Sequence, residues 1–433
     1  MRQRNRLISF RPARRGFRTF VLGVAAAMFF LAACDSGSPA EEPPPDEGRG
    51  SIVSTTLIET ATKQELSGLF ASFGVPVAPA FDVEIYRVVY RTIDPKGNET
   101  TASGAVMRPR GLAGAMPMVS YQHGTVVARD AVASVGGLDV PETLIGVVFA
   151  TTGYFAVMPD YLGLGTSEGL HPYVHAASLA TATVDMLRAG RRFAETEGLD
   201  LNEGLFLIGY SEGGFATAAT QRLIEAEHAD EFSLTATAPM AGNYDMSGTM
   251  ADLMLSREPY PSPFYFPYTL LAYDDVYDLF ENLSDAFVPP WDVRLPVLFD
   301  GAHDSAQIDA ELPAVPLEIA RDDYIAAFEN DADHPLRKAL RDNDLYAWTP
   351  KTPMRMYHCV DDDLVPFANT EVASASFKAR GAAAVEVVSL TFGGHAACAA
   401  PALLLGKFWF DSLRSAKQGP PPDLSGVHLR LTP

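Results

Sequence analysis

The chain has 433 residues, of which 47% are hydrophobic and 20% charged, which excludes collagen-like, coiled-coil and wholly disordered proteins. Its formal charge is −21, yet seven arginines lie in the first 18 residues, before the first acid at Asp35. Without those seven the charge becomes −28, and so acidic a body repels phosphate backbones and argues against nucleic acid as a partner.

The first 50 residues predict a targeting signal and a membrane anchor. Basic residues 1–18 precede an apolar stretch, Thr19–Ala33, which is too short to span a hydrocarbon core of ~30 Å and is typical of a signal peptide. The stretch ends in Leu-Ala-Ala-Cys, which resembles a bacterial lipobox. We therefore expect residues 1–33 to be a lipoprotein signal peptide and Cys34 to carry the lipid, outside the cytoplasm. A plain secretory signal with a chance cysteine is the alternative.

Residues 34–50 are rich in proline, acids and glycine, so we expect a flexible tether there.

The body beyond the tether alternates between predicted strands and helices. A hairpin comes first, and the later strands are separated by helices, which predicts a mostly parallel sheet with helices on both faces. The expected strands are Val83–Ile93, Glu99–Met107, Pro117–Tyr121, Tyr154–Pro159, Leu205–Tyr210, Leu234–Met240, Met354–Tyr357 and Val385–Leu390. The expected helices are Ala176–Glu195, Gly214–His228 and Pro401–Lys417.

The alternation stops between Asn243 and Pro350. This stretch contains no clear run of alternating strands, and it has helix-like runs near Ser305–Ala310 and Asp322–Asn330. Eight aromatic residues lie between positions 260 and 280. We predict that residues 243–350 form a helical cap inserted into a core made of residues 51–242 and 351–433.

The motif G-x-S-x-G occurs at residues 165–169 and again at 209–213. A nucleophilic serine of this type needs a sharp strand-to-helix turn with small residues around it. Ser211 follows a buried-type strand and precedes a predicted helix, and Gly209 and Gly213 supply the space. Ser167 lies in a glycine-flanked loop with no helix after it. We therefore predict Ser211 as the nucleophile and Ser167 as a loop hydroxyl; a tight turn without chemistry is the alternative for Ser211.

A serine hydroxyl requires a histidine base oriented by a carboxylate, and in α/β-hydrolases the order along the chain is Ser, Asp, His. The acidic loop after the strand at Met354 fits the pattern H-G-x-x-D-x-x-V-P and selects Asp362, although Cys359 replaces the glycine. Asp361 and Asp363 are alternatives, and three adjacent acids also suit a calcium-binding or solvated loop.

His395 follows the last predicted strand in a glycine-rich loop, and we predict it as the base. His358 precedes the acid and is expected to pack at the end of a strand. The developing oxyanion needs backbone donors. We assign these to the N–H of Glu212 and of Thr125, with Gly124 next in order; a purely conformational glycine is the alternative.

Cys359 lies three residues before Asp362, and Cys398 lies three residues after His395. A working triad would bring these loops together, so we predict a Cys359–Cys398 disulfide that contributes about 3 kcal/mol. Two buried free thiols are the alternative.

From about residue 52 onward the chain resembles an α/β-hydrolase of the secretory lipase family. The resemblance is carried by three segments: residues 120–125 (SYQHGT), 159–165 (PDYLGLG) and 209–214 (GYSEGG). It implies hydrolysis of a small-molecule or lipid ester through an acyl-enzyme, with no metal or organic cofactor and with a cap that shapes the acyl pocket. Asp160 in such a motif is expected to brace the loops. A serine peptidase on the same fold and a non-catalytic binding lipoprotein are the competing hypotheses.

Overall fold

The computed structural model describes residues 48–416. The predicted signal peptide, Cys34 and most of the predicted tether therefore lie outside the described residues. Arg49 and Gly50, which we assigned to the tether, contact the folded body: Arg49 Nε lies 3.0 Å from Asp185 Oδ2, and the N–H of Gly50 donates to the carbonyl of Arg91. The folded body thus begins slightly earlier than the composition indicated.

The described residues contain a nine-stranded sheet of order β1-β2-β3-β5-β4-β6-β7-β8-β9. Pairing is antiparallel from β1 to β5 along this order and parallel from β5 to β9, so the sheet is mostly parallel. The strands are β1 Ile52–Ala61, β2 Asp82–Ile93, β3 Glu99–Arg110, β4 Met116–Gln122, β5 Phe155–Pro159, β6 Leu201–Tyr210, β7 Ala236–Met240, β8 Met354–Cys359 and β9 Val385–Leu390.

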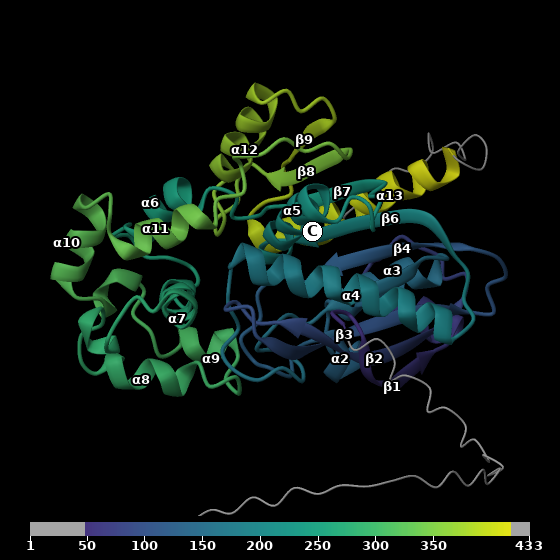
Figure 1. The fold of residues 1–433 in the computed structure, drawn as a ribbon, viewed down its shortest axis with the longest axis horizontal. Coiled ribbons are helices and arrows are strands. Elements are labelled where there is room, and N and C mark those ends of the chain that lie inside the picture. Colours follow the sequence, from purple (N-terminus) through teal and green to yellow (C-terminus); the bar gives the residue numbers. More distant parts are fainter. Residues whose placement is uncertain (1–47, 417–433) are drawn as a thin grey trace, which may run out of the picture. The chain divides into compact units, whose positions relative to one another are not determined.

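Helices cover both faces of the sheet, which explains why the central strand β6 is apolar and buried from Leu205 to Tyr210. Leu205 and Leu207 pack in one hydrophobic cluster with side chains of α4, whereas Phe206 and Ile208 pack in another with α3 and α13. In Figure 1, α4 crosses in front of the strands. The helices are α1 Lys63–Ser72, α2 Ala133–Gly136, α3 Thr143–Thr151, α4 Ala176–Thr196, α5 Glu212–Glu227, α6 Ala251–Met254, α7 Tyr265–Tyr277, α8 Trp291–Leu298, α9 Ser305–Asp309, α10 Asp322–Asn330, α11 Pro335–Asp342, α12 Ala368–Ala379 and α13 His395–Ala416.

The insertion, residues 243–350, adds no strand to this sheet. It runs through helices α6 to α11, and α7 to α11 form a green group beside the sheet in Figure 1. Its apolar side chains, such as Leu270, Phe287 and Leu340, are buried in one cluster that also includes Phe215 and Ala219 of α5. The insertion therefore packs against the helix that follows Ser211.

Two features of the predicted element pattern differ from the structure. β1, α1, α3 and α12 were not predicted, and α13 begins at His395 rather than at Pro401. Gly393, at a φ of +104°, turns the chain just before this helix. Pro401 lies inside the helix, where its missing N–H removes a single backbone hydrogen bond. The predicted base is therefore at the start of a helix and not in the middle of a loop.

Within residues 48–416, no single helix combines the length and apolar character needed to cross a membrane; by length and composition alone, the segments Ala133–Asp139 and Thr143–Thr151 would meet that test as a pair bent by 80°.

Candidate active site

Ser211 occupies the turn between β6 and α5, at the carboxyl edge of the parallel strands. Its backbone has φ +61° and ψ −125°, a conformation that residues other than glycine seldom adopt. The N–H of Ser211 donates to the carbonyl of Met240 at the end of the neighbouring strand β7, over 2.9 Å. This turn is the strained strand-to-helix geometry that a nucleophile elbow requires.

The glycines around Ser211 are required by close backbone contacts. A Cβ atom at Gly209 would overlap the carbonyl group of Gly213, and a Cβ at Gly213 would overlap the carbonyl of Gln122. Because no side chain fits at either position, the G-x-S-x-G spacing lets strand, turn and helix approach this closely. Ser167, in contrast, lies in a turn, and no helix begins directly after it.

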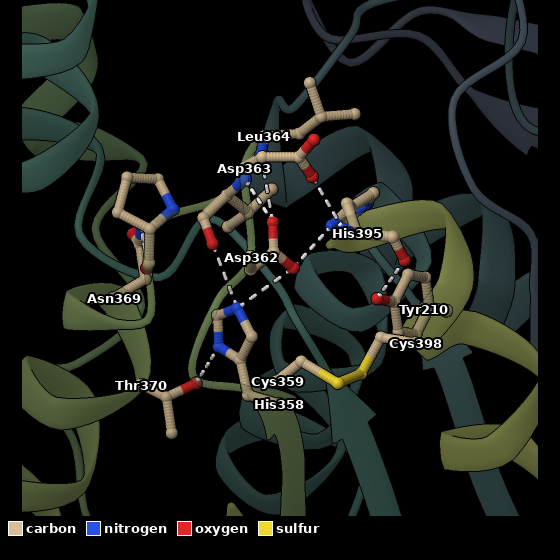
Figure 2. Close-up of polar contacts among 12 residues, drawn as sticks. Tyr210, His358, Cys359, Asp362, Asp363, Leu364, Asn369, Thr370, His395 and Cys398 are labelled. Carbon is tan, nitrogen blue, oxygen red and sulfur yellow. Dashed lines mark hydrogen bonds and ion pairs between the residues drawn. A yellow bond between two sulfur atoms is a disulfide. The ribbon is translucent and has the colours of Figure 1, made fainter. Parts of the chain in front are cut away.

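Asp362 and His395, which are 33 positions apart, meet at the ends of β8 and α13. His395 Nδ1 lies 2.7 Å from Asp362 Oδ2, and Figure 2 shows the two side chains pointing toward each other. Because a carboxylate oxygen only accepts, His395 Nδ1 carries the hydrogen and Nε2 is left unprotonated in the neutral ring. The side chain of Asp362 is fully enclosed. Its Oδ1 atom also accepts from the N–H groups of Leu364 and Val365.

Burial alone would raise the pKa of Asp362, since it disfavours the charged form. Hydrogen bonds from His358 and His395, together with the backbone N–H of Val365, more than offset this effect and hold the pKa of Asp362 well below its usual value. The carboxylate is therefore ionised at neutral pH, as an orienting group for His395 must be.

His358 has a role that its position in the sequence did not reveal. We predicted packing at the end of a strand, and the side chain is indeed buried, but its Nε2 lies 3.0 Å from the carbonyl of Val365 and 3.3 Å from Asp362 Oδ2. Its Nδ1 lies 2.8 Å from Thr370 Oγ1. His358 therefore holds the acid loop from below (Figure 2). The pattern H-G-x-x-D-x-x-V-P contains His358, Asp362 and Val365, but it did not show that the histidine contacts the other two residues.

The two neighbouring acids, which were alternatives to Asp362, lie differently. Asp363 Oδ1 accepts from the backbone N–H of His395 over 2.8 Å, so it contacts the main chain and not the imidazole. Asp361 is exposed. Within the described part of the chain, no three His, Cys, Asp or Glu side chains are grouped to hold a metal ion. The acid loop is thus arranged around His395.

Cys359 and Cys398, which are 39 positions apart in sequence, are joined by a disulfide with an S–S distance of 2.04 Å. Both side chains are buried. The bridge ties the end of β8 to the first turn of α13, and Figure 2 shows it beside the contact between the acid and the base. A further bond supports the same turn: Tyr210 donates its hydroxyl to the carbonyl of His395 over 2.7 Å.

The loop after β4 reaches the nucleophile. A Cβ atom on Gly124 would lie 3.9 Å from the Cβ of Ser211. The N–H of Gly124 donates to Glu142 Oε2 over 3.0 Å, so Gly124, which we placed next in order as a donor, has its N–H already engaged. The N–H groups of Thr125 and Glu212 donate to no acceptor within residues 48–416. Both N–H groups are therefore without a partner in the described part of the chain.

Glu142 was not anticipated from the sequence, and its carboxylate fixes this loop. Its Oε2 accepts from the N–H of Gly124 and from the Tyr121 hydroxyl, over 3.0 and 2.8 Å. Engaging the Gly124 N–H sets the orientation of the adjoining peptide. Glu142 is therefore a positioning residue for the loop that carries Thr125.

Replacing Glu142 with leucine is expected to lower kcat by about tenfold or more with little change in KM, because misoriented backbone donors weaken the transition state more than the bound substrate. Glu142→Gln keeps a carbonyl oxygen that can accept, and most of the activity should return. Steady-state kinetics on one ester measures both variants. Equal losses in the two variants, or a change in KM alone, would contradict this assignment.

The side chain of Glu212 is buried and points away from solvent. Its Oε1 lies 2.8 Å from His171 Nε2 and accepts from the N–H of Val174 over 3.4 Å. His171 Nδ1 in turn lies 2.7 Å from the carbonyl of Leu162. Asp160 belongs to the same region and accepts from Ser103 Oγ over 2.6 Å and from Ser134. These contacts tie the residue after the nucleophile to the loop after β5.

A cavity of about 790 Å³, counting its open mouth, lies beside Ser211. The wall is mostly apolar, and much of it comes from the insertion and the acid loop. Three of the eight aromatics between positions 260 and 280 line it, whereas Phe264, Tyr268 and Tyr273 are buried in the core. The apolar lining includes Val174, Met246, Met250, Leu253, Met254, Tyr260, Tyr265, Phe266, Leu364 and Val365.

The profile of the family described as secretory lipase matches residues 138–252. Among solved structures, a rice cell wall degrading esterase LipA from Xanthomonas oryzae has a TM-score of 0.77 and 30% identity, over 85% of this chain and 98% of its own. A putative hydrolase from Legionella pneumophila has a TM-score of 0.78 and 28% identity, over 84% and 98%. Candida antarctica lipase A in its closed state has a TM-score of 0.66 at 16% identity, over 89% and 88%, a likeness of fold.

A search of curated proteins gives no match. The sheet and its helices have the α/β-hydrolase architecture of the esterase and lipase structures, as the sequence predicted. By its likeness to LipA across nearly the whole of that chain, and by its match to the family profile, this chain belongs to the secretory lipase family of α/β-hydrolases and is a hydrolase of the lipase and esterase type.

Proposed function

We propose that the chain hydrolyses carboxylic esters through an acyl-enzyme formed on Ser211. The observation that carries the proposal is the contact between His395 Nδ1 and Asp362 Oδ2, 2.7 Å long, at the same edge of the sheet as the strained turn of Ser211. Acyl transfer needs an oriented imidazole and a serine hydroxyl held in a strained turn at the edge of the sheet.

In this mechanism Ser211 Oγ attacks the ester carbonyl while His395 Nε2 takes the hydroxyl proton. The charge on the tetrahedral oxygen is stabilised by the N–H groups of Thr125 and Glu212. Collapse transfers the proton from His395 to the departing alcohol and leaves the acyl group on Ser211. Water then attacks the acyl-enzyme with His395 as base, which releases the acid and restores the serine. Asp362 stays ionised throughout and stabilises the imidazolium.

A fluorophosphonate probe tests this function directly, because it phosphonylates only an activated serine. Labelling of Ser211, located by peptide mapping, together with turnover of p-nitrophenyl esters, would support the proposal. Labelling together with a preference for aminoacyl anilides would favour the peptidase alternative. If Ser211 stayed unlabelled in folded protein, the result would favour the alternative of a non-catalytic binding protein.

The insertion supplies the second part of the proposal. Since residues 246–269 form much of the cavity wall beside Ser211, we assign residues 243–350 as a cap that shapes the acyl site, on a core of residues 51–242 and 351–433. This division also agrees with the strand order, because β7 and β8 flank the insertion and pair with each other.

The location completes the proposal. The family is secretory, in agreement with an extracytoplasmic enzyme. We propose that lipid on Cys34 holds it at a bacterial membrane, beyond the signal peptide of residues 1–33 and on a tether within residues 34–50. Globomycin should cause the unprocessed precursor to accumulate, and Cys34→Ala should release the processed protein into the soluble fraction. A mature wild-type protein with an unmodified Cys34 would contradict the proposed lipid anchor.

A further inference from the structure

The side chain of Asn243 lies in the wall of the cavity beside Ser211 with its hydrogen-bonding capacity unused. It is 4% exposed, and its Oδ1 is enclosed without a partner among the described residues. A buried amide oxygen without a hydrogen bond is costly, and native structures rarely keep one without a reason. An amide in this position can both donate to a ligand and accept from one.

Three other polar side chains in the same wall already have partners. The Tyr260 hydroxyl donates to the carbonyl of Leu364 and the Thr269 hydroxyl to the carbonyl of Tyr265, each over 2.8 Å. Ser256 Oγ accepts from the N–H of Glu258 over 3.2 Å. Asn243 differs from these residues because its amide has no such bond. Asn243 can therefore bond to a ligand without giving up a hydrogen bond within the protein.

Asn243 is also close to the reacting centre. It lies three residues beyond Met240, whose carbonyl accepts from the N–H of Ser211, and Met240 pairs with Tyr210 across β7 and β6. Three residues of extended chain span at most about 10 Å. Ser211 and Asn243 both line the same cavity, so an acyl group on Ser211 can extend to Asn243.

Hydrogen bonds fix the backbone just after Asn243, which restricts where its side-chain amide can lie. The Asp245 carboxylate accepts from the N–H groups of Gly248 and Thr249, which starts a single π-helical turn at Met246–Met250. Turns of this kind occur often at functional sites. Met246 and Met250 then face the cavity as adaptable apolar groups.

We propose that the cavity selects acyl groups that carry a hydroxyl within a few carbons of the ester carbonyl. The hydroxyl, which both donates and accepts, pairs with the amide of Asn243, and the remaining methylenes pack against Met246 and Met250. An uncharged amide suits an uncharged hydroxyl, and Glu258, which is exposed, is the single charged residue of this lining. The inference deepens the proposed function and rests on it, since it concerns the acyl group that Ser211 receives.

Hydrolysis of methyl 3-hydroxyhexanoate and methyl hexanoate by the full chain, followed by alkali uptake at constant pH, tests the inference. Each enantiomer of the hydroxy ester is measured separately. For the preferred enantiomer we expect kcat/KM to exceed that of the plain ester by about tenfold or more, because the plain ester leaves the amide unpaired. In Asn243→Leu that ratio should fall to one or below, through loss on the hydroxy ester.

Thr269→Val is the matched control. It removes a hydroxyl from the same wall, but one already bonded to Tyr265, so the ratio should stay within about twofold of the wild-type value. Asn243→Ala gives a second test if leucine disturbs folding, and fluorophosphonate labelling of Ser211 reports whether each variant is folded.

A wild-type ratio at or below one for both enantiomers would overturn the inference, as would a ratio unchanged in both Asn243 variants. In those cases labelling of Ser211 and hydrolysis of the plain ester would still stand, so the proposed function would survive. A folded wild-type protein that is not labelled and cleaves neither ester would overturn both.

Discussion

Ser211→Ala, His395→Ala and Asp362→Asn are each expected to lower kcat by about four to six orders of magnitude. Ser211 would supply the attacking oxygen, and His395 would carry its proton. Asparagine at 362 can present its N–H group to His395 Nδ1, which favours the wrong tautomer and leaves Nε2 unable to accept. Because the three groups act together, double variants should lose little more than single ones. Single-turnover kinetics with a p-nitrophenyl ester measures the loss.

The adjacent acids provide matched controls for Asp362→Asn. Asp361 is exposed, and Asp361→Asn should retain wild-type kcat. Asp363 accepts from the backbone N–H of His395, so Asp363→Asn should cost about tenfold or less. If Asp363→Asn were as damaging as Asp362→Asn, the acid would be misassigned. A normal rate in any of the three triad variants would remove that residue from the mechanism.

Removing the disulfide with the double substitution Cys359→Ala and Cys398→Ala is expected to lower the free energy of unfolding by about 4 kcal/mol. This figure is the loop-entropy value for a separation of 39 residues. Urea unfolding followed by tryptophan fluorescence measures the change in stability. Activity should fall as well, because the bridge joins the segments that bring Asp362 against His395.

Reduction of the wild-type protein is the control for that experiment. A thiol reductant should lower the urea midpoint of the wild type and leave that of the double variant unchanged. Equal midpoints for oxidised wild type and double variant would show that the bridge does not stabilise the fold. Peptide mapping under non-reducing conditions that found both cysteines alkylated would show that it does not form.

The parallel part of the sheet was predictable because each of its strands is short, apolar and bounded by turn residues. The continuous apolar run at 205–210 gave both the strand and its burial on two faces. β1 was missed because its outward residues are mixed and largely exposed, so no alternation marks it as an edge strand. The start of α13 was misplaced because Pro401 resembles a first-turn proline, and only the packed structure shows that it lies inside the helix.

The site residues that could be proposed from the sequence were those whose chemistry requires particular residue types close by in the chain. Ser211 needs glycines at fixed positions, and His395 needs a loop after the last strand. The contacts of His358 and Glu142 depend instead on how loops fold back, over separations of 4 to 18 positions, against neighbouring segments. Glu142, for example, meets Gly124 across 18 positions and matches no motif. Such contacts depend on how loops are packed over the sheet, which no short pattern encodes.

The pairing of β7 with β8 has a consequence for how this protein can change over generations. The insertion leaves the sheet after Met240 and returns before Met354, at two strands that are hydrogen-bonded neighbours. Because β7 and β8 are parallel, the insertion leaves at the carboxyl end of one strand and returns at the amino end of the next, so it is one long crossover between neighbours. Recombination can lengthen, shorten or exchange such a crossover without altering the strand order. Changes in the insertion can therefore alter the cavity wall while the strand order that holds Ser211, Asp362 and His395 stays the same.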